Sequence, residues 1–340
     1  MAVKFSRIAT VAGSSESELR RLADEVDQGE HFQVYRARLR RRNRSIFWPD
    51  TPYDTALKQI RPALERLLTY DAPGHVYGFV KRRSTRQNAA QHLDADCVLT
   101  IDLADFFPSI KREAVIAALK KADADDDTCD VIGRLATPRG ALGMGLSTSP
   151  YLSNLVFLET DGELTALAAN LDIRFTRYVD DLTFSGKIDD TKADAIKAVL
   201  TTNGWTVNDR KTRFMRRGRA QYVTGLSVSD PNAPRAPRRL KRRMRWRLNM
   251  IERYGFYNYF THFGGGAGGS MRHEAERLRG LAQYIASVEP SLRGEWLERW
   301  YRAVPTTTHG AGDEDDMSGL IALDEDDIRR LLGGNGLGKN

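Results

Sequence analysis

The sequence has few cysteines and no long apolar segment. Among its 340 residues are 2 cysteines, Cys97 and Cys129, too few for a disulfide framework and, by themselves, for a zinc site. No apolar run is long enough to span a bilayer, and the N-terminal Met-Ala-Val-Lys-Phe-Ser lacks the apolar core of a signal peptide. We therefore expect a cytoplasmic protein with reduced thiols and no membrane partner. A chain of this length is also expected to form more than one lobe.

Positive charge is in modest excess and unevenly distributed. Lysine and arginine number 52 against 45 aspartates and glutamates, which gives a net charge of +7. The basic residues concentrate in three segments, Arg36 to Arg44, Lys81 to Arg83, and Arg235 to Arg247. Such segments favour binding to phosphate groups, although a solvated helix face accounts for the first of them equally well.

Two segments are predicted to lie in one β-sheet. Residues 97–101 are typical of a buried strand, which ends at Asp102. Residues 174–185 are β-forming residues around Asp180 and Asp181, a pattern that predicts a hairpin with two carboxylates at its tip. Helices are expected over 56–68, 108–122, 149–169, 191–202, 238–254 and, with a break at Pro290, 271–304. A short strand is expected over 205–207, and a strand and turn over 222–229.

Asp102, Asp180 and Asp181 are candidate metal ligands. A strand that ends in Asp beside a hairpin tipped with Asp-Asp can gather three carboxylates on one sheet. Mg²⁺ prefers oxygen ligands of this kind, and a pair of ions can activate an attacking oxygen and stabilise a leaving one in phosphoryl transfer. Asp-Asp is also a common turn pair, because Asp hydrogen-bonds to its own backbone. The hairpin tip alone therefore does not distinguish a site from a turn.

Further segments stand in a specific order around these aspartates. They are Ile101-Asp-Leu-Ala-Asp-Phe-Phe-Pro-Ser-Ile110, Ser147-Thr-Ser-Pro-Tyr-Leu-Ser-Asn154, Tyr178-Val-Asp-Asp181, Asn208-Asp-Arg-Lys211 and Val223-Thr-Gly-Leu226. In this order they resemble the catalytic and palm motifs of reverse transcriptases of the retron and group II intron type. The resemblance covers residues 30–300 and implies a metal-dependent polymerase that copies RNA into DNA.

The resemblance assigns roles at the reacting centre. It implies that Asp102, Asp180 and Asp181 bind two Mg²⁺ ions, with Mn²⁺ as an alternative, and that the carbonyl of Leu103 assists. Val223, Thr224 and Gly225 are expected to support the primer end. The residues expected to contact the triphosphate of an incoming dNTP are Lys211, Lys81 and Arg83, with Arg82 as an alternative to Arg83.

An aromatic pair and a methionine also belong to the predicted nucleotide site. The family places a ring beneath the sugar of the incoming nucleotide, where it clashes with a 2′-hydroxyl. Alternation after a strand lets Phe106 enter the core while Phe107 faces the site, so Phe107 is the preferred candidate. Met144 stands where most relatives have glutamine. A thioether cannot donate the hydrogen bond that an amide donates, so this departure bears on nucleotide affinity.

Two segments narrow the resemblance to retron enzymes. Gln87-Asn-Ala-Ala-Gln-His92 is similar to their Asn-Ala-x-x-His signature, and Val223-Thr-Gly225 to their Val-Thr-Gly signature. Asn88 and His92 also fit the capping of a helix, and Gly225 a turn. The retron resemblance implies a structured non-coding RNA as primer and template, branched RNA-linked single-stranded DNA (msDNA) as product, an effector or toxin protein as a further partner, and antiphage defence as the role. The residues expected to bind RNA are Asn88, His92, Arg239, Arg242, Arg243 and Trp246.

The implied fold is the α+β right hand of polymerases. Residues 1–95 are expected to form N-terminal helices and fingers, and 96–230 a palm of antiparallel sheet on helices, with 123–147 partly in the fingers. A helical thumb is expected over 231–304 and an acidic, Gly-rich tail over 305–340. Two alternatives stay open: another bacterial reverse transcriptase, defence-associated or group II intron-like, and a non-catalytic RNA-binding protein on the same scaffold. The presence of all three aspartates disfavours the second.

Overall fold

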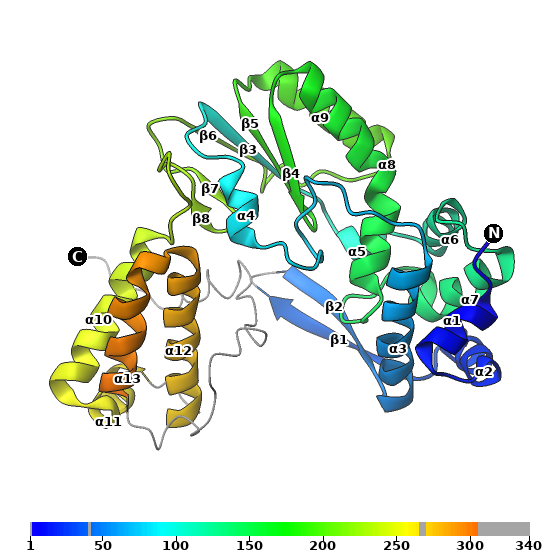
Figure 1. The fold of residues 1–340 in the computed structure, drawn as a ribbon, viewed down its shortest axis with the longest axis horizontal. Helices are drawn as coiled ribbons and strands as arrows, with labels where there is room; N and C mark the ends of the chain where they lie inside the picture. Colours follow the sequence, from blue (N-terminus) through cyan, green and yellow to red (C-terminus); the bar gives the residue numbers. More distant parts are fainter. Residues whose placement is uncertain (1, 40–41, 265–269, 305–340) are drawn as a thin grey trace. The chain divides into compact units, whose positions relative to one another are not determined.

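The computed structural model describes residues 2–39, 42–264 and 270–304, so the predicted tail lies outside the described residues. By its internal contacts the chain divides into two compact units. The first comprises Met1–Ser84 and Asp96–Phe214, and the second comprises Thr85–Ala95 and the chain from Met215 onward. Figure 1 shows the elements of both. Within the described ranges, no helix is both long and apolar enough to cross a membrane.

The first unit begins with helices α1 (Phe5–Ala12) and α2 (Glu16–Asp27) and continues into an antiparallel hairpin, β1 (Phe32–Leu39) and β2 (Arg42–Pro49). The helix face considered for residues 36–44 is therefore wrong. Side chains alternate between the two faces of this hairpin, as they do in β-strands. The rings of Phe32 and Phe47 pack on one face, with centroids 5.4 Å apart, while Tyr35 and Trp48 are exposed. Arg36 and Arg44 thus lie on strands of a hairpin.

His31 fixes the foot of this hairpin. Its Nδ1 lies 2.7 Å from Asp50 Oδ2 and its Nε2 lies 2.9 Å from Glu25 Oε2, while its carbonyl accepts from Asp50 N–H. Burial opposes the charged ring, but the two carboxylates outweigh burial and raise the pKa of His31. Asp50 also caps helix α3 (Thr51–Leu67) by accepting from the backbone N–H of Tyr53.

A four-stranded sheet with the order β4-β5-β3-β6 supports the predicted carboxylates. Its strands are β3 (Cys97–Asp102), β4 (Arg174–Tyr178), β5 (Asp181–Gly186) and β6 (Arg213–Arg216). Both β3 and β4 pair antiparallel with β5. The strand expected over 205–207 is wrong. Trp205 instead turns into the core, where its Nε1 donates to Thr160 Oγ1 at 2.9 Å, and Val207 makes only an isolated bridge to Leu103.

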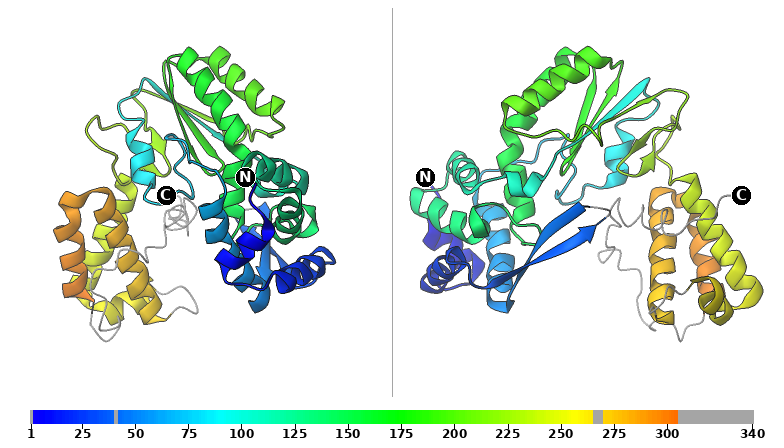
Figure 2. Two further views of the ribbon diagram at one scale, coloured as in Figure 1. Left: turned by 45° about the vertical axis from the view of Figure 1, so that its right-hand side comes forward. Right: turned by 180° about the vertical axis from the view of Figure 1, so that it is seen from behind.

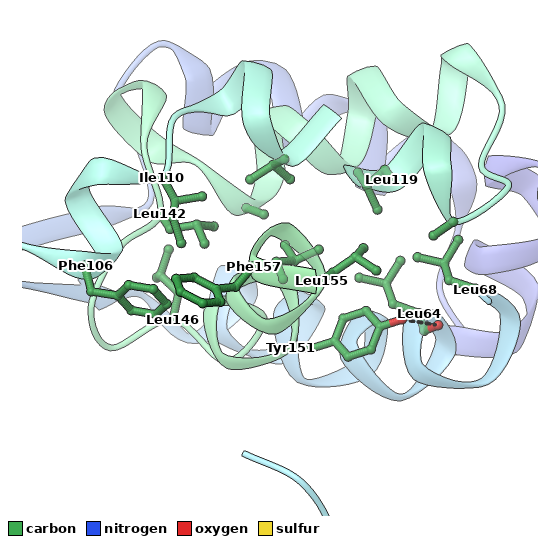
Figure 3. Close-up of a cluster of buried hydrophobic side chains, with 14 of the residues drawn as sticks. Leu64, Leu68, Phe106, Ile110, Leu119, Leu142, Leu146, Tyr151, Leu155 and Phe157 are labelled. Atoms are coloured by element: carbon green, nitrogen blue, oxygen red, sulfur yellow. Dashed lines mark hydrogen bonds between the residues drawn. The ribbon is translucent and has the colours of Figure 1, made fainter. Parts of the chain in front are cut away.

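Helices α8 (Ser149–Asn170) and α9 (Asp190–Thr202) lie along one side of this sheet (Figures 1 and 2). Buried residues from α8, including Tyr151, Leu155 and Phe157, pack against Leu64 and Leu119 from other helices (Figure 3). The remaining helices of this unit are α5 (Phe106–Ser109), α6 (Arg112–Lys121), α7 (Asp126–Ala136) and the 3₁₀ turn η1 (Pro138–Gly140). The same core includes Ile101, Leu103 and Leu182, the chain neighbours of Asp102 and Asp181.

The second unit combines the short segment Thr85–Ala95 with the helices in the C-terminal part of the chain. It contains α4 (Thr85–Ala90), the hairpin β7 (Tyr222–Val223) and β8 (Leu226–Ser227), and helices α10 (Arg238–Tyr254) and α12 (Met271–Val288). Shorter helical pieces are α11 (Phe256–Tyr259), η2 (Phe260–Gly264), η3 (Pro290–Leu292), η4 (Gly294–Glu298) and α13 (Arg299–Ala303). An apolar stripe on α10, with Met244 and Leu248, faces a core that includes Leu278, Trp296 and Trp300.

Candidate active site

The sheet brings the three predicted aspartates to one end of neighbouring strands. Asp102 ends β3 and is the cross-strand partner of Asp181, the first residue of β5. Directly opposed residues of an antiparallel pair share a face of the sheet. Asp180 precedes β5 in the turn, and its carbonyl accepts from Leu103 N–H at 3.2 Å. The predicted hairpin with carboxylates at its tip is therefore present.

Asp102 is held by Asn208 and Lys211, two residues of the segment Asn208-Asp-Arg-Lys211 that resembles a palm motif. Lys211 Nζ lies 2.5 Å from Asp102 Oδ1, and Asn208 Nδ2 donates to Oδ2 at 2.9 Å. The backbone N–H of Asn208 also donates to the carbonyl of Asp102, at 2.8 Å. Lys211, predicted near the triphosphate, thus lies beside the candidate carboxylates and pairs with a buried one.

Asp180 experiences the opposite electrostatics. Burial, followed by repulsion from Asp102, raises the pKa of its carboxyl to about 6, although its own backbone N–H, Lys211 and Arg44 act to lower it. Arg44 belongs to β2 and was predicted only as part of a basic segment. Its influence on Asp180 shows that the hairpin brings a cation toward the carboxylates, which no local sequence signal indicated.

The carboxylate oxygens at this site are of the kind that a hard cation prefers, but they do not form a three-residue metal cluster among the described residues. Asp102 and Asp180 are adjacent oxygen donors of like charge, and bringing two carboxylates together favours a divalent cation. Across the described part of the chain, however, no three His, Cys, Asp or Glu side chains group as a metal site. Asp102 and Asp180 therefore fit a shared ion, and the participation of Asp181 and the Leu103 carbonyl stays a prediction.

The turn before Asp180 is strained. Val179 has a backbone φ of 60°, in the left-handed region that a β-branched residue rarely occupies. Conformations of this kind cost about 1–3 kcal/mol and persist where the surroundings enforce them. The carbonyl of Val179 accepts from the buried Arg177 at 3.1 Å. A basic side chain behind the catalytic turn was not foreseen from the sequence.

Phe106 and Phe107 take different environments, as predicted, although both lie in helix α5 and not on the extended segment that alternation assumed. Phe106 is buried, with its ring centroid 5.5 Å from Trp205 and 5.9 Å from Phe157. Phe107 is half-buried and lies 6.3 Å from the ring of Phe79, which is itself exposed. The prediction that Phe106 belongs to the core is confirmed, and Phe107 as the nucleotide-facing ring stays a prediction.

The other predicted nucleotide contacts have structural partners. Arg83 donates to the backbone carbonyls of Ala72, Pro73 and Val76, so its guanidinium is committed to holding a loop. The exposed Lys81 pairs with Glu65 at 2.8 Å. The carbonyl of Met144 accepts from Phe47 N–H at 2.8 Å, which ties its loop to β2. Of these residues, Lys81 has the side chain that solvent reaches most readily.

The two retron-like signatures meet in the second unit. Thr224 and Gly225, at φ of 46° and 78°, form the turn between β7 and β8, and Thr224 Oγ1 donates to the carbonyl of Thr85 at the start of α4. Asn88 and His92 are both 0% exposed. Direct RNA contact through these two side chains does not fit this packing, because neither reaches solvent. Val223, predicted to support the primer end, is likewise buried.

Helix α10 presents the remaining predicted RNA contacts on one face. Arg239, Arg242 and Trp246 are exposed, and Arg243 is half-buried one turn from Arg239. Burial, followed by repulsion from Arg239 and Arg277, lowers the pKa of Arg243. Like charges gathered in this way favour an anionic partner such as a phosphate.

The sequence that builds this sheet matches a known protein family. Residues 50–241, more than half of the 340-residue chain, match the family described as reverse transcriptase (RNA-dependent DNA polymerase). The fold is accordingly that of a right-hand nucleic-acid polymerase, as predicted. The chain belongs to the reverse transcriptase family.

Curated relatives confirm the retron resemblance. The retron Mx162 reverse transcriptase of Myxococcus xanthus is 30% identical over 327 residues, covering 84% of this chain and 64% of that enzyme. The retron Mx65 reverse transcriptase of the same species is 35% identical over 198 residues, covering 51% of this chain and 46% of that enzyme. The chain thus spans less than two thirds of the length of either relative.

A solved telomerase also aligns with this chain. The telomerase of Candida albicans, in complex with a fragment of telomeric RNA, aligns with a TM-score of 0.43 and 11% identity over 80% of this chain and 63% of that chain.

Proposed function

We propose that this protein is the RNA-directed DNA polymerase of a retron. The observation that carries the proposal is the pair Asp102 and Asp180, held side by side at the end of β3 and in the adjoining turn, with Lys211 bound to Asp102. The family and the retron relatives supply the reaction class. The product proposed is msDNA, and the biological role proposed is antiphage defence.

The reaction forms a bond between a nucleic-acid hydroxyl oxygen and the α-phosphorus of a dNTP, and breaks the bond to pyrophosphate. Asp102 and Asp180, with Asp181, would hold two Mg²⁺ ions, which would activate the attacking oxygen and stabilise the leaving one. The Lys211 ammonium neutralises the Asp102 carboxylate, and it would move from Asp102 to the triphosphate when a dNTP binds. Phe107 would pack under the sugar and exclude a 2′-hydroxyl.

The nucleic-acid partner proposed is a structured non-coding RNA that serves as primer and template. Basic side chains on β2 and α10, Arg44 in the first unit and Arg239 and Arg242 in the second, suit the phosphates of such an RNA. Initiation from an internal 2′-hydroxyl requires one nucleotide of the folded RNA to reach the carboxylates. Such positioning can supply several kcal/mol of rate enhancement and makes initiation specific to one RNA.

The central test is Asp180→Asn, which keeps the shape of the side chain and removes its charge. We expect primer extension to fall by more than the about 10–100-fold that follows loss of groups which merely support metal ligands. Folding and RNA affinity should stay near those of the unmodified protein. The matched control is Asp209→Asn at an exposed carboxylate paired with Lys197. Robust extension by Asp180→Asn would contradict the catalytic assignment.

The retron part of the proposal is tested on nucleic acid bound to the protein in its native host. Retron activity predicts DNA covalently joined to RNA, shortened by either DNase or RNase and separated into two strands by a debranching enzyme. DNA without attached RNA would point instead to another kind of reverse transcriptase.

A further inference from the structure

A buried ionic network lies behind the turn that carries Asp180. Arg177, on β4, has a fully buried side chain and donates through Nε and Nη2 to the two carboxylate oxygens of Asp161 on α8, at 2.8 and 2.6 Å. The guanidinium also lies over the ring of Phe157, 4.5 Å from its centroid. The charge is therefore paired on one side and packed on the other, which leaves Nη1 directed elsewhere.

Nη1 of Arg177 bonds to the turn itself. It donates to the carbonyl of Val179 at 3.1 Å and to Oδ1 of Asn154 at 3.0 Å. Asn154, also buried on α8, donates in turn through Nδ2 to the carbonyl of Gly78 at 3.0 Å. These bonds connect α8 and β4 with the loop that contains Gly78.

Gly78 completes the enclosure of Val179. A Cβ atom at Gly78 would lie 2.4 Å from the backbone N of Val179 and 2.7 Å from its Cγ2, so only glycine fits. The turn with its unfavourable φ is thus in contact with Gly78 at the N–H and side chain of Val179 and bonded to Arg177 at the Val179 carbonyl. A strained backbone persists only where such contacts over-determine it.

Stability alone does not account for this network. A buried ion pair loses its hydration on folding, and apolar groups of similar volume often replace such pairs without loss of stability. One bond of this network reaches the carbonyl of Val179, the residue before Asp180, and another holds the carbonyl of Gly78, whose Cα packs against Val179. We propose that Arg177 is a positioning residue that, with Asn154 and Gly78, holds the Val179–Asp180 peptide so that the Asp180 carboxylate stays beside Asp102. This inference rests on the proposed polymerase function.

Arginine suits this task better than lysine. A planar guanidinium can satisfy Asp161 through two of its nitrogens and still donate to Val179 and Asn154 through the third. A lysine ammonium carries the same charge at one point and cannot reach all of these acceptors in this geometry.

The sharpest test is Gly78→Ala, because it displaces the turn and leaves the Arg177–Asp161 pair unmodified. A misplacement of about 1 Å at a reacting group can cost about 100-fold in rate. We expect kcat of primer extension to fall by that order, the Mg²⁺ concentration at half-maximal rate to rise, and hydrogen exchange at residues 178–181 to quicken. RNA affinity of the folded protein should stay close to that of the unmodified chain, while overpacking at this buried position lowers Tm. The matched control is Gly162→Ala on α8, where an added Cβ meets nothing within 4 Å.

A second variant, Arg177→Lys, keeps the charge opposite Asp161 and removes the bond to Val179. It should show the same rise in half-maximal Mg²⁺ concentration in its folded fraction. Unchanged kcat and exchange in Gly78→Ala would overturn the inference. So would an activity loss that follows only the folded fraction, with the Mg²⁺ dependence unmoved, since a purely structural role predicts that result. Failure of the proposed function looks different, because the unmodified chain would then lack polymerase activity or Asp180→Asn would retain it.

Discussion

At the scale of single residues, the site depends on partners far apart in the chain. Asp102 meets Lys211 across 109 positions, and Arg177 meets Asp161 across 16 and holds Val179 beside it. The pKa of Asp180, raised by burial and by Asp102, reflects this gathering rather than the local Tyr-Val-Asp-Asp sequence. The same residue types at an exposed turn would carry no such charge crowding.

The burial of Asn88 is expected to lower the free energy of unfolding. It is 0% exposed, and among the described residues neither of its amide atoms has a hydrogen-bond partner. An unsatisfied buried polar group costs about 1–3 kcal/mol, so Asn88→Leu, which keeps the branching of the side chain, should raise the free energy of unfolding by about that amount. Chemical denaturation measures it, with the exposed Gln87→Leu on the same helix as control. A lower stability in Asn88→Leu would show that the amide has a partner, such as an ordered water.

At the scale of elements, hairpins place the functional groups. The β1–β2 hairpin brings Arg44 into the field of Asp180, and the β4–β5 hairpin carries the catalytic turn. The β7–β8 hairpin turns at Thr224 and Gly225, both at positive φ, as two-residue hairpin loops require. Helix α10 places its functional groups without a hairpin: its apolar stripe is buried, and Arg239 and Arg242 on another face are exposed.

Neutralising that face of α10 should weaken RNA binding irrespective of sequence. Each lost phosphate contact lowers the slope of log affinity against log salt by roughly 0.7–0.9. The triple variant Arg239→Gln, Arg242→Gln, Arg243→Gln is therefore expected to flatten the slope by about two. Fluorescence anisotropy over a salt series measures this. The control neutralises Lys58, Lys120 and Lys121, each of which pairs with a carboxylate. An unchanged slope would show that α10 is only a solvated face.

At the scale of the whole molecule, the second unit is assembled from two distant stretches of chain. Residues 85–95 leave the first unit and pack with residues beyond 215. Gln221 Nε2 donates to the carbonyl of Ala95 at 2.9 Å, Asp94 N–H donates to the carbonyl of Val228, and Arg86 Nε donates to the carbonyl of Val288. The short segment therefore joins the β7–β8 hairpin to the end of α12.

This assembly predicts that a fragment of residues 215–304 is incomplete. Without residues 85–95, the amides of the β7–β8 region should lose their protection from hydrogen exchange, because their packing partners are missing. The same fragment with residues 85–95 joined by a flexible Gly-Ser linker should recover that protection. Equal protection in both fragments would show that the inserted segment does not organise the hairpin.

Sequence by itself determined the reaction class, the three aspartates and most helices, because these follow from local periodicity and from short motifs in a fixed order. Cys97–Asp102, Arg174–Gly186 and Arg238–Tyr254 form the elements that their patterns predict. The basic segment over 36–44 and the strand over 205–207 were misjudged, since long-range packing of Phe47 and Trp205 overrode local preference. Only the tertiary structure decided that Asn88 and His92 are buried, that Arg83 holds a loop, and that Arg177 bonds to the turn before Asp180. Those outcomes depend on which distant atoms share the low-dielectric interior, and no local pattern encodes that.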